Sequence, residues 1–290
     1  MQIVTGSPDS ELHAAPVTVA VGEFDGVHAG HRAVLAELRR QASAAQCPAA
    51  VVLVNPRIPG YGTRLACPAE RLELLDQLGV DFVVRPVLPP GARRSGRLLY
   101  EQLLGRTLRT RVAVHRAGSR QAGDSPDAAQ LVALVGAAHG FAVVTVPVVT
   151  GISGTRIRSV LARGDLAIAA AMLGRSYSVR GRVVRGDGRG RQLGYATANV
   201  ALAPNVALPG DGVFAGSYER PGGPARPSMI ALGHRPTFYD GGGQRLLEAH
   251  LLDCDEYLYG EAARVSGRAA VPGRRIPCPD QGPAPVRVGR

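Results

Sequence analysis

A segment rich in glycine and arginine contains residues suited to bind phosphate. Residues 181–199 read GRVVRGDGRGRQLGYATAN, so glycines alternate with acidic, arginine and amide side chains. Glycine lets the backbone approach a ligand and align successive N–H groups, and arginine pairs with phosphate oxygens. A solvated hairpin tip explains the segment equally well when it is considered alone. The candidate nucleotide-binding residues are Gly186, Asp187, Gly188, Gly190, Arg191, Gly194, Thr197 and Asn199, with Thr197 as the magnesium ligand.

A second candidate segment contains two histidines three residues apart. Residues 22–31 read GEFDGVHAGH and directly follow the apolar run Val17–Val21. This order predicts a strand, a tight turn and then a helix, whose amino-terminal end attracts anions. We interpret the segment as a nucleotide-binding turn, in preference to a pair of surface histidines. Its candidate residues are Gly22, Phe24, Asp25, Gly26, His28, Gly30 and His31.

A third segment supplies hydroxyl groups and positive charge at the start of another predicted helix. Residues 152–158 read ISGTRIR. Serine and threonine cap helices or bind phosphate, and arginine neutralises phosphate oxygens. By itself the segment is equally typical of a capped helix with solvated arginines. Its candidate residues are Ser153, Thr155, Arg156 and Arg158.

Buried strands that alternate with helices must position the first of these turns. This order predicts an α/β fold, with a parallel sheet and helices on both of its faces. Ligands of such folds bind at the carboxyl ends of the strands. The predicted strands are Val17–Val21, Val51–Val54, Val80–Val84, Val112–Val114 and Val143–Val146. The predicted helices are His31–Ala45, Ala69–Leu78, Arg97–Leu104 and Asp127–Ala138.

The second half of the chain has a different pattern. Two helices are predicted over 152–175, with Asp165 placed to cap the second and Gly174 to end it. Short alternating segments then follow between Gly/Pro turns, which indicates a small antiparallel β-barrel. We predict domains at 1–151 and 176–265, a helical link at 152–175, and an atypical, disordered tail at 266–290.

Composition narrows the class of protein. The formal net charge is +11, and every basic residue is arginine. Such a charge suits small polyanionic ligands, whereas an aromatic content of 4% gives no basic–aromatic pattern for stacking on nucleic acid. No signal peptide or membrane-spanning run is recognised, and the four cysteines are widely scattered. We therefore expect a cytoplasmic protein with reduced thiols that binds neither nucleic acid nor a membrane.

These motifs, in this order, resemble those of prokaryotic bifunctional riboflavin kinase/FMN adenylyltransferases, also called FAD synthases. GEFDGVHAGH resembles their nucleotidylyltransferase signature, and ISGTRIR resembles their ISSTxIR motif. GDGRGRQLGYATAN resembles their kinase signature, although Ala196 stands where proline is usual. LEAHLLD, DGVFAG and DEYLYG also match, and the resemblance extends from about Val17 to Gly260.

The resemblance implies a Rossmann-like nucleotidylyltransferase domain followed by a riboflavin kinase-like barrel. It implies riboflavin, FMN and ATP as ligands, with Mg²⁺ as cofactor. Glu248 is then the base that accepts a proton from the ribityl hydroxyl of riboflavin as this hydroxyl attacks the γ-phosphorus of ATP. His28, His31 and Arg158 position and stabilise the adenylyl transfer, in which the phosphate of FMN attacks the α-phosphorus of a second ATP.

Three segments depart from the family pattern. LVNPRIPG at 53–60 lacks the usual Phe-Asp-Pro-His-Pro-like turn, and HRAGSRQAGD at 115–124 lacks the aromatic and amide residues of a Gly-x-Asp/Asn-Phe-x-Phe-Gly element. Both departures count against adenylylation more than against the kinase reaction. Near Ser266 the sequence changes to Arg, Pro, Gly and Ala, which suggests either a frameshift or a barrel that lacks a strand.

Other functions stay open on the sequence alone. One is a divergent paralogue that retains a single activity or acts on a modified flavin or nucleotide. Another is a protein that binds flavin or nucleotide without catalysis. A nucleic-acid binder rests on charge alone.

Overall fold

The computed structural model describes residues 1–6, 15–54, 63–87, 100–117, 128–186, 197–234, 245–252, 254 and 256–271. The chain forms two compact units. The first comprises Met1–Gly62 and Pro68–Gly154, and the second comprises Thr63–Cys67 and Thr155–Arg290. No helix within the described ranges is both long and apolar enough to cross a membrane.

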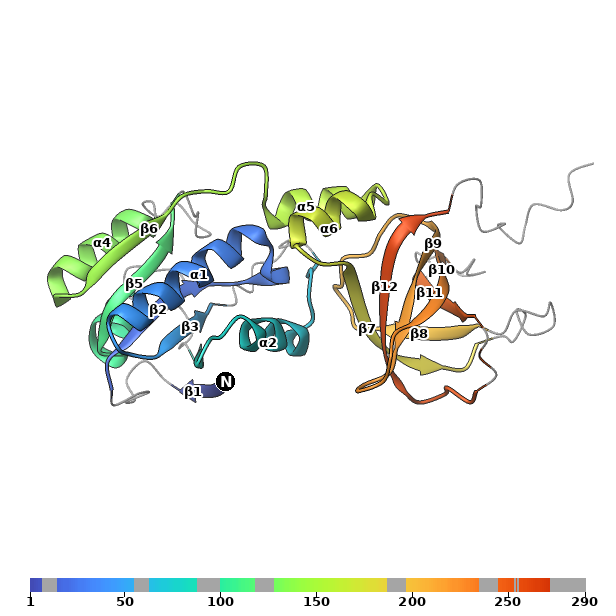
Figure 1. Ribbon diagram of the computed structural model, residues 1–290, viewed down its shortest axis with the longest axis horizontal. Helices are drawn as coiled ribbons and strands as arrows, with labels where there is room; N and C mark the ends of the chain where they lie inside the picture. The colour runs from blue at the N-terminus through green and yellow to red at the C-terminus, as the bar shows by residue number, and fades with distance from the viewer. Residues whose placement is uncertain are drawn as a thin grey trace, which may run out of the picture. The chain divides into compact units, whose positions relative to one another are not determined.

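The first unit is built on a six-stranded sheet in which all neighbouring strands are parallel (Figure 1). The strand order is β1-β4-β3-β2-β5-β6. The chain adds β3 and β4 on one side of β2 and then adds β5 and β6 on the other side, so the order of the strands reverses between β2 and β5. Ligands of doubly wound folds bind at such a reversal. The strands are β1 (Gln2–Gly6), β2 (Val17–Gly22), β3 (Ala49–Leu53), β4 (Phe82–Pro86), β5 (Thr110–Arg116) and β6 (Ala142–Val146).

Helices cover both faces of this sheet, which confirms the predicted α/β architecture. One apolar core joins the sheet to α1 (Ala29–Ala44) and α2 (Pro68–Gln77). The other joins the opposite face to η3 (Glu101–Thr107) and α4 (Ala128–His139). Neighbouring strand residues alternate between the two cores, as β geometry requires: Val51 faces the first and Val52 the second.

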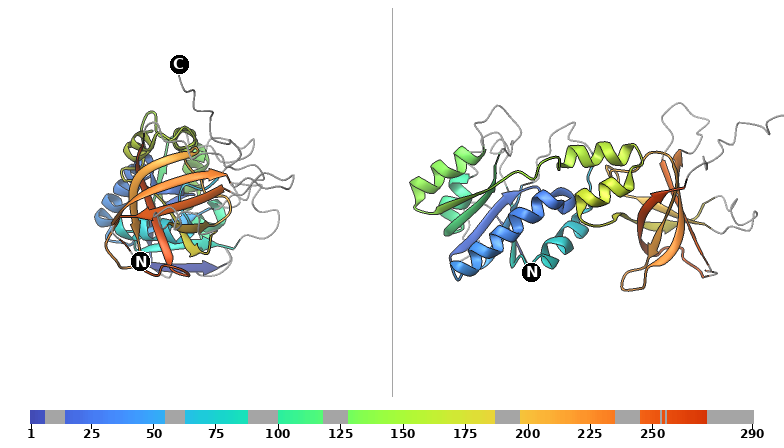
Figure 2. Two further views of the ribbon diagram at one scale, coloured as in Figure 1. Left: turned by 90° about the vertical axis from the view of Figure 1, so that its right-hand side faces the viewer. Right: turned by 45° about the horizontal axis from the view of Figure 1, so that its top comes forward.

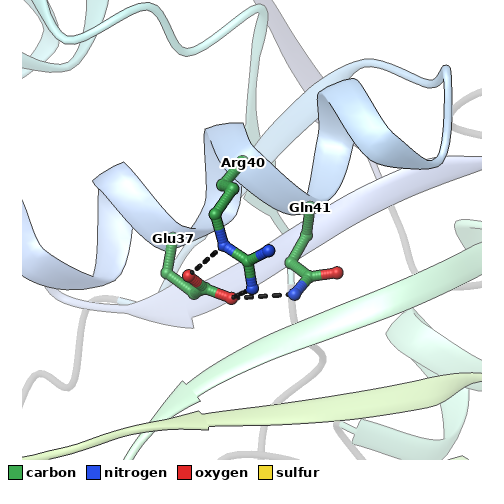
Figure 3. A network of polar contacts seen from close by, with 3 residues as sticks. All are labelled: Glu37, Arg40 and Gln41. Atoms are coloured by element: carbon green, nitrogen blue, oxygen red, sulfur yellow. Dashed lines mark hydrogen bonds and ion pairs between the residues drawn. The ribbon is translucent and has the colours of Figure 1, made fainter.

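Helix α1 has a clear inner and outer face. Leu35 and Leu38 are buried in the core. On the outer face, the Glu37 carboxylate accepts hydrogen bonds of 2.8 and 2.6 Å from Arg40 and of 2.8 Å from Gln41 (Figure 3). These bonds hold the pKa of Glu37 below its ordinary value. An exposed pair of this kind contributes little to stability, so core packing is what fixes the helix.

Two elements of the first unit differ from the sequence-based prediction. β1 was not predicted, and it adds an edge strand by pairing with β4. The helix expected at Arg97–Leu104 is a π-helix at Glu101–Thr107, and residues 97–99 lie outside the described ranges. Edge strands and helix registers depend on contacts made elsewhere in the fold, which short sequence windows do not contain.

The second unit contains a closed six-stranded antiparallel barrel in the order β10-β11-β8-β7-β12-β9, visible from two further directions in Figure 2. The expected antiparallel barrel is therefore confirmed. Helices α5 (Gly154–Ala162) and α6 (Leu166–Leu173) belong to the same unit. The strands are β7 (Tyr177–Val184), β8 (Ala198–Leu202), β9 (Gly212–Glu219), β10 (Arg226–His234), β11 (Arg245–Leu251) and β12 (Ala262–Ala270).

The residues at the two ends of α6 agree in part with the predicted helix cap and helix end. Gly174 ends the helix in the left-handed conformation, with φ 72°, as predicted. Asp165 occupies the N-cap position, but its side chain makes no capping hydrogen bond. Its carboxylate instead lies 3.3 Å from Nε of Arg163.

The prediction of a tail from residue 266 is wrong for its first part. Ser266–Ala270 belong to β12, which pairs with β7 on one side and β9 on the other and so closes the barrel. The expected loss of a strand does not occur. Backbone hydrogen bonds to two neighbours support this strand despite its small and charged side chains. Residues 272–290 lie outside the described ranges.

Candidate functional site

The turn between β2 and α1 has an unusual backbone. Phe24, Gly26 and Val27 adopt positive φ values of 49°, 69° and 40°. A β-branched residue in this region is a genuine outlier, and such strain, about 1–3 kcal/mol a residue, gathers at ligand sites. The main-chain carbonyl of Glu23 accepts a 2.9 Å hydrogen bond from Arg71 of α2. The turn is therefore held in a conformation that short-range sequence preference opposes.

The two predicted histidines meet at the start of α1. His28 is buried, and its Nδ1 accepts a 3.4 Å hydrogen bond from the backbone N–H of His31. Their rings stack with centroids 3.8 Å apart, and the ring of Phe24 lies 5.0 Å from that of His31. The structure thus brings together three of the predicted residues at the carboxyl end of β2.

Two glycines of this turn lie close to neighbouring side chains. A Cβ at Gly22 would lie 3.1 Å from the ring of Phe24, and one at Gly30 would lie 3.2 Å from Nδ1 of His28. Both contacts are tighter than most real Cβ atoms make. These glycines therefore allow the aromatic and imidazole rings to pack against the backbone.

The environment of His31 disfavours its charged form. Burial, followed by the positive charges of His28 and Arg116, lowers the pKa of His31 well below 6.5. Within the described ranges, Nδ1 of His31 is buried and has no hydrogen-bond partner. The ring is therefore neutral at pH 7 and has a polar atom that a ligand can satisfy.

Arg116 was missed as a site residue when the sequence alone was considered. It is the last residue of β5, the strand that pairs with β2 where the strand order reverses. One Nη of Arg116 lies 4.0 Å from the point that a Cβ at Gly30 would occupy. The available signal was an arginine at the carboxyl end of an apolar run, but only the sheet order places it beside the histidines.

The ISGTRIR residues lie at the start of α5. Ser153 precedes the helix, Thr155 and Arg156 are exposed in its first turn, and Ile157 is buried. Nε of Arg158 donates a hydrogen bond to the carbonyl of Thr63. Thr155 onward belongs to the second unit, so a shared role with the histidines of the first unit stays a prediction.

The second unit brings together residues of the predicted kinase site on one surface of the barrel. Asn199 of β8 pairs in register with Glu248 of β11 and with Val184 of β7. Thr197, Asn199 and Glu248 are half-buried, whereas the alternating neighbours Ala198 and Leu247 are buried inside the barrel. The hydroxyl, amide and carboxylate groups therefore share its outer face.

Gly186 lies directly against this face. A Cβ there would lie 2.2 Å from Nδ2 of Asn199, a distance that no real structure tolerates without movement. The start of the glycine-rich segment is therefore adjacent to Asn199. The other predicted residues of the segment lie outside the described ranges: Asp187, Gly188, Gly190, Arg191 and Gly194.

Metal binding to protein groups alone is not supported by the described part of the chain, where no three His, Cys, Asp or Glu residues gather. Mg²⁺ differs from other metals because it commonly uses one or two protein oxygens and takes the rest from phosphates and water. Thr197 and Glu248 offer oxygens of this kind on one face. The donor set therefore fits Mg²⁺ bound together with a nucleotide.

Two family models match the chain, one over most of the first unit and one over the barrel. The FAD synthetase model matches residues 10–160, and the riboflavin kinase model matches residues 173–270. The second match includes the whole of β12.

Known relatives match across both halves. The bifunctional riboflavin kinase/FMN adenylyltransferase of Escherichia coli K12 is 34% identical over 265 residues, covering 85% of this chain and 82% of the relative. The protein of the same description from Pseudomonas fluorescens is 32% identical over 280 residues, covering 91% and 88%.

The fold also has a solved counterpart. A structure described as a macrolide-efflux protein from Streptococcus pneumoniae superposes with a TM-score of 0.82, covering 93% of this chain and 91% of that one. At 24% identity, this likeness supports the fold alone.

Proposed function

Since the chain belongs to the family of bifunctional riboflavin kinase/FMN adenylyltransferases, we propose that it makes FMN from riboflavin and FAD from FMN, with ATP as co-substrate in both steps. The observation that carries the proposal is the pairing of Glu248 with Asn199 beside Gly186. A carboxylate next to the start of the glycine-rich segment supports phosphate transfer at this face.

In the kinase reaction, Glu248 accepts the proton of the ribityl hydroxyl as that oxygen attacks the γ-phosphorus of ATP, and ADP leaves. A general base contributes about 10²–10⁴-fold to such a step. Asn199 orients the nucleotide, because its amide lies over Gly186 and beside Glu248. The glycine-rich segment binds the phosphates through its backbone N–H groups.

Thr197, with Glu248 nearby, is the residue that would hold Mg²⁺. Once bound, the ion neutralises charge on the phosphate oxygens of ATP. The protein groups keep the nucleotide and the acceptor hydroxyl in position.

In the adenylyl transfer, a phosphate oxygen of FMN bonds to the α-phosphorus of ATP, and the bond to the leaving pyrophosphate breaks. The attacking oxygen is already anionic, so no strong protein base is needed. His28, His31 and Arg158 act by positioning and by stabilising charge. The turn Gly22–Gly30, including Phe24, Asp25 and Gly26, shapes the phosphate site of the first unit. Ser153, Thr155 and Arg156 are further candidate phosphate-binding residues.

One assay tests the proposal. The purified protein is incubated with riboflavin, ATP and Mg²⁺, and the flavins are separated by chromatography. We expect FMN followed by FAD. Formation of FMN without FAD would show that the protein has only the kinase activity. Riboflavin that is bound but not converted would contradict an enzymatic role.

Two variants assign the reactions to the two halves. Glu248→Gln should abolish FMN formation, because the amide cannot accept the proton, yet convert supplied FMN to FAD. His28→Ala should do the reverse. Chromatography of both products, with circular dichroism to verify folding, makes the comparison. If either folded variant loses both reactions, this division of roles is wrong.

A further inference from the structure

We propose that Arg116 is a phosphate-binding residue of the first unit, which grips a phosphate oxyanion next to His28 and His31. This inference rests on the proposed adenylyl transfer in that unit. It assigns a role to a residue in a segment, 115–124, that departs from the family pattern.

The position of Arg116 follows from the sheet. β2 and β5 are parallel neighbours, with Ala20 opposite Val114, so their carboxyl ends lie at the same edge. β2 leads from this edge into the turn that carries the histidines, and β5 ends there at Arg116. The backbone N–H of Ala117 donates a 2.9 Å hydrogen bond to the carbonyl of Val146, which fixes the chain just after the arginine.

The side chain of Arg116 turns toward the start of α1. Its Nη1 and the Nδ1 of His28 lie 4.0 and 3.2 Å from the point that a Cβ at Gly30 would occupy. Two nitrogen-bearing side chains therefore converge on the bare backbone of one glycine. Nδ1 of His31, buried without a hydrogen bond among the described residues, lies in the same cluster.

The charges of Arg116 and the two histidines favour an anionic ligand. Among the described residues, no carboxylate forms an ion pair with the half-buried Arg116. A positive guanidinium beside the uncharged imidazole of His31 at a helix amino terminus attracts an anion. The guanidinium fork matches two oxygens of one phosphate group, which a point charge does not.

Inorganic pyrophosphate is the probe that tests the site directly. It is titrated into the full-length protein while the imidazole signals of His31 are followed by NMR. We compare the wild type with Arg116→Gln, which removes the charge, and Arg116→Lys, which keeps the charge but loses the fork. Arg111→Gln is the matched control, because Arg111 is an exposed arginine on the same strand.

Pyrophosphate should shift the His31 signals of the wild type and of Arg111→Gln at the same concentrations. Arg116→Gln should weaken this binding about tenfold or more, with partial recovery in Arg116→Lys. The pKa of His31 should also rise in Arg116→Gln, because one positive neighbour is lost. A merely structural role would not give the partial recovery, whereas the rise in pKa verifies only that the Arg116 charge acts on His31.

Steady-state kinetics identify the phosphate that Arg116 binds. A rise in KM for ATP alone indicates the triphosphate, and a rise in KM for FMN alone indicates the flavin phosphate. If Arg116→Gln binds pyrophosphate as the wild type does and its KM values are unchanged, the inference is wrong. The proposed synthesis of FAD would not be affected by that result. Pyrophosphate binding that depends on Arg116, in a wild type that makes no FAD, contradicts the proposed reaction but supports the site. If pyrophosphate does not shift the His31 signals of the wild type, the inference is wrong.

Discussion

At the scale of single residues, the His28–His31 pair shows how packing keeps an imidazole uncharged beside a proposed anion site. Burial, followed by the positive charges of His28 and Arg116, lowers the pKa of His31 and keeps its ring uncharged. A bound phosphate would supply the opposite charge and favour the protonated ring. The imidazole can therefore respond to the ligand by gaining a positive charge where it is needed.

The stability of the first unit should depend on the protonation of His31. The folded state holds the pKa of His31 well below the 6.5 of an unfolded chain. At pH values between these two pKa values, the unfolded state therefore binds more protons than the folded state. The free energy of unfolding should fall below about pH 6.5, by at most about 1.4 kcal/mol a pH unit from this group. Urea unfolding at a series of pH values measures this slope. His31→Gln should reduce it, whereas His139→Gln at the exposed end of α4 should keep it.

Gly186 offers a test of the kinase face. A methyl group there would overlap the amide of Asn199, so Gly186→Ala should displace the nucleotide-orienting group. A displacement of about 1 Å can reduce the rate 10²-fold. We expect such a loss in FMN formation, with FAD formation from FMN unchanged. Gly223→Ala, whose added Cβ would meet its nearest atom at 3.4 Å, is the control and should retain both activities.

At the scale of elements, β12 shows that pairing with neighbouring strands can form a barrel strand whose own composition does not predict one. Its residues are small or charged after Val265, yet it pairs with β7 and β9 along most of its length. Close packing explains the small residues. A Cβ at Gly267 would lie 2.6 Å from Leu166 of α6, and a Cβ at Gly216 would lie 2.1 Å from the carbonyl oxygen of Ser266.

Closure of the barrel should therefore depend on Gly216. Gly216→Ala would force β9 and β12 apart, because the obstructing atom belongs to the backbone. We expect a loss of about 1–3 kcal/mol, typical of overpacking. Faster amide hydrogen exchange in β9 and β12 would report it. Gly212→Ala lies on the same strand and would meet Phe214 at an ordinary 3.6 Å, so equal losses in both variants would disprove this account.

At the scale of the whole molecule, each unit has its own buried apolar residues, with His28 and His31 in the first unit and Asn199 and Glu248 in the second. The proposed intermediate, FMN, is a small molecule that is free to diffuse. The two reactions can then proceed on different copies of the chain.

Mixed variants test this independence. Neither Glu248→Gln nor His28→Ala alone should make FAD from riboflavin. Their mixture should do so, because FMN released by the second variant feeds the first. Chromatographic time courses, with the wild type at equal total concentration as control, should show FAD after a lag. A mixture that accumulates FMN without FAD would show that the intermediate must stay on one chain.

The local patterns of the chain were sufficient for much of the fold. Apolar β-branched runs separated by amphipathic segments predicted β2 to β6 and their helices, and alternating segments predicted an antiparallel barrel. The spacing of His28 and His31 predicted their place at the start of α1, since a turn followed by a helix is decided within a few residues. These features depend on neighbours in the sequence and can therefore be predicted from it.

Other features depend on residues that are distant along the chain. The sheet order alone places Arg116 beside Gly30, and pairing with β4 alone makes β1 a strand. Backbone bonds to two partners extend β12 past Ser266, where composition indicated a tail. Strand pairing and charge clustering arise from long-range contacts. The closure of the barrel and the arginine that lies beside the histidines therefore follow from the three-dimensional fold and not from local sequence.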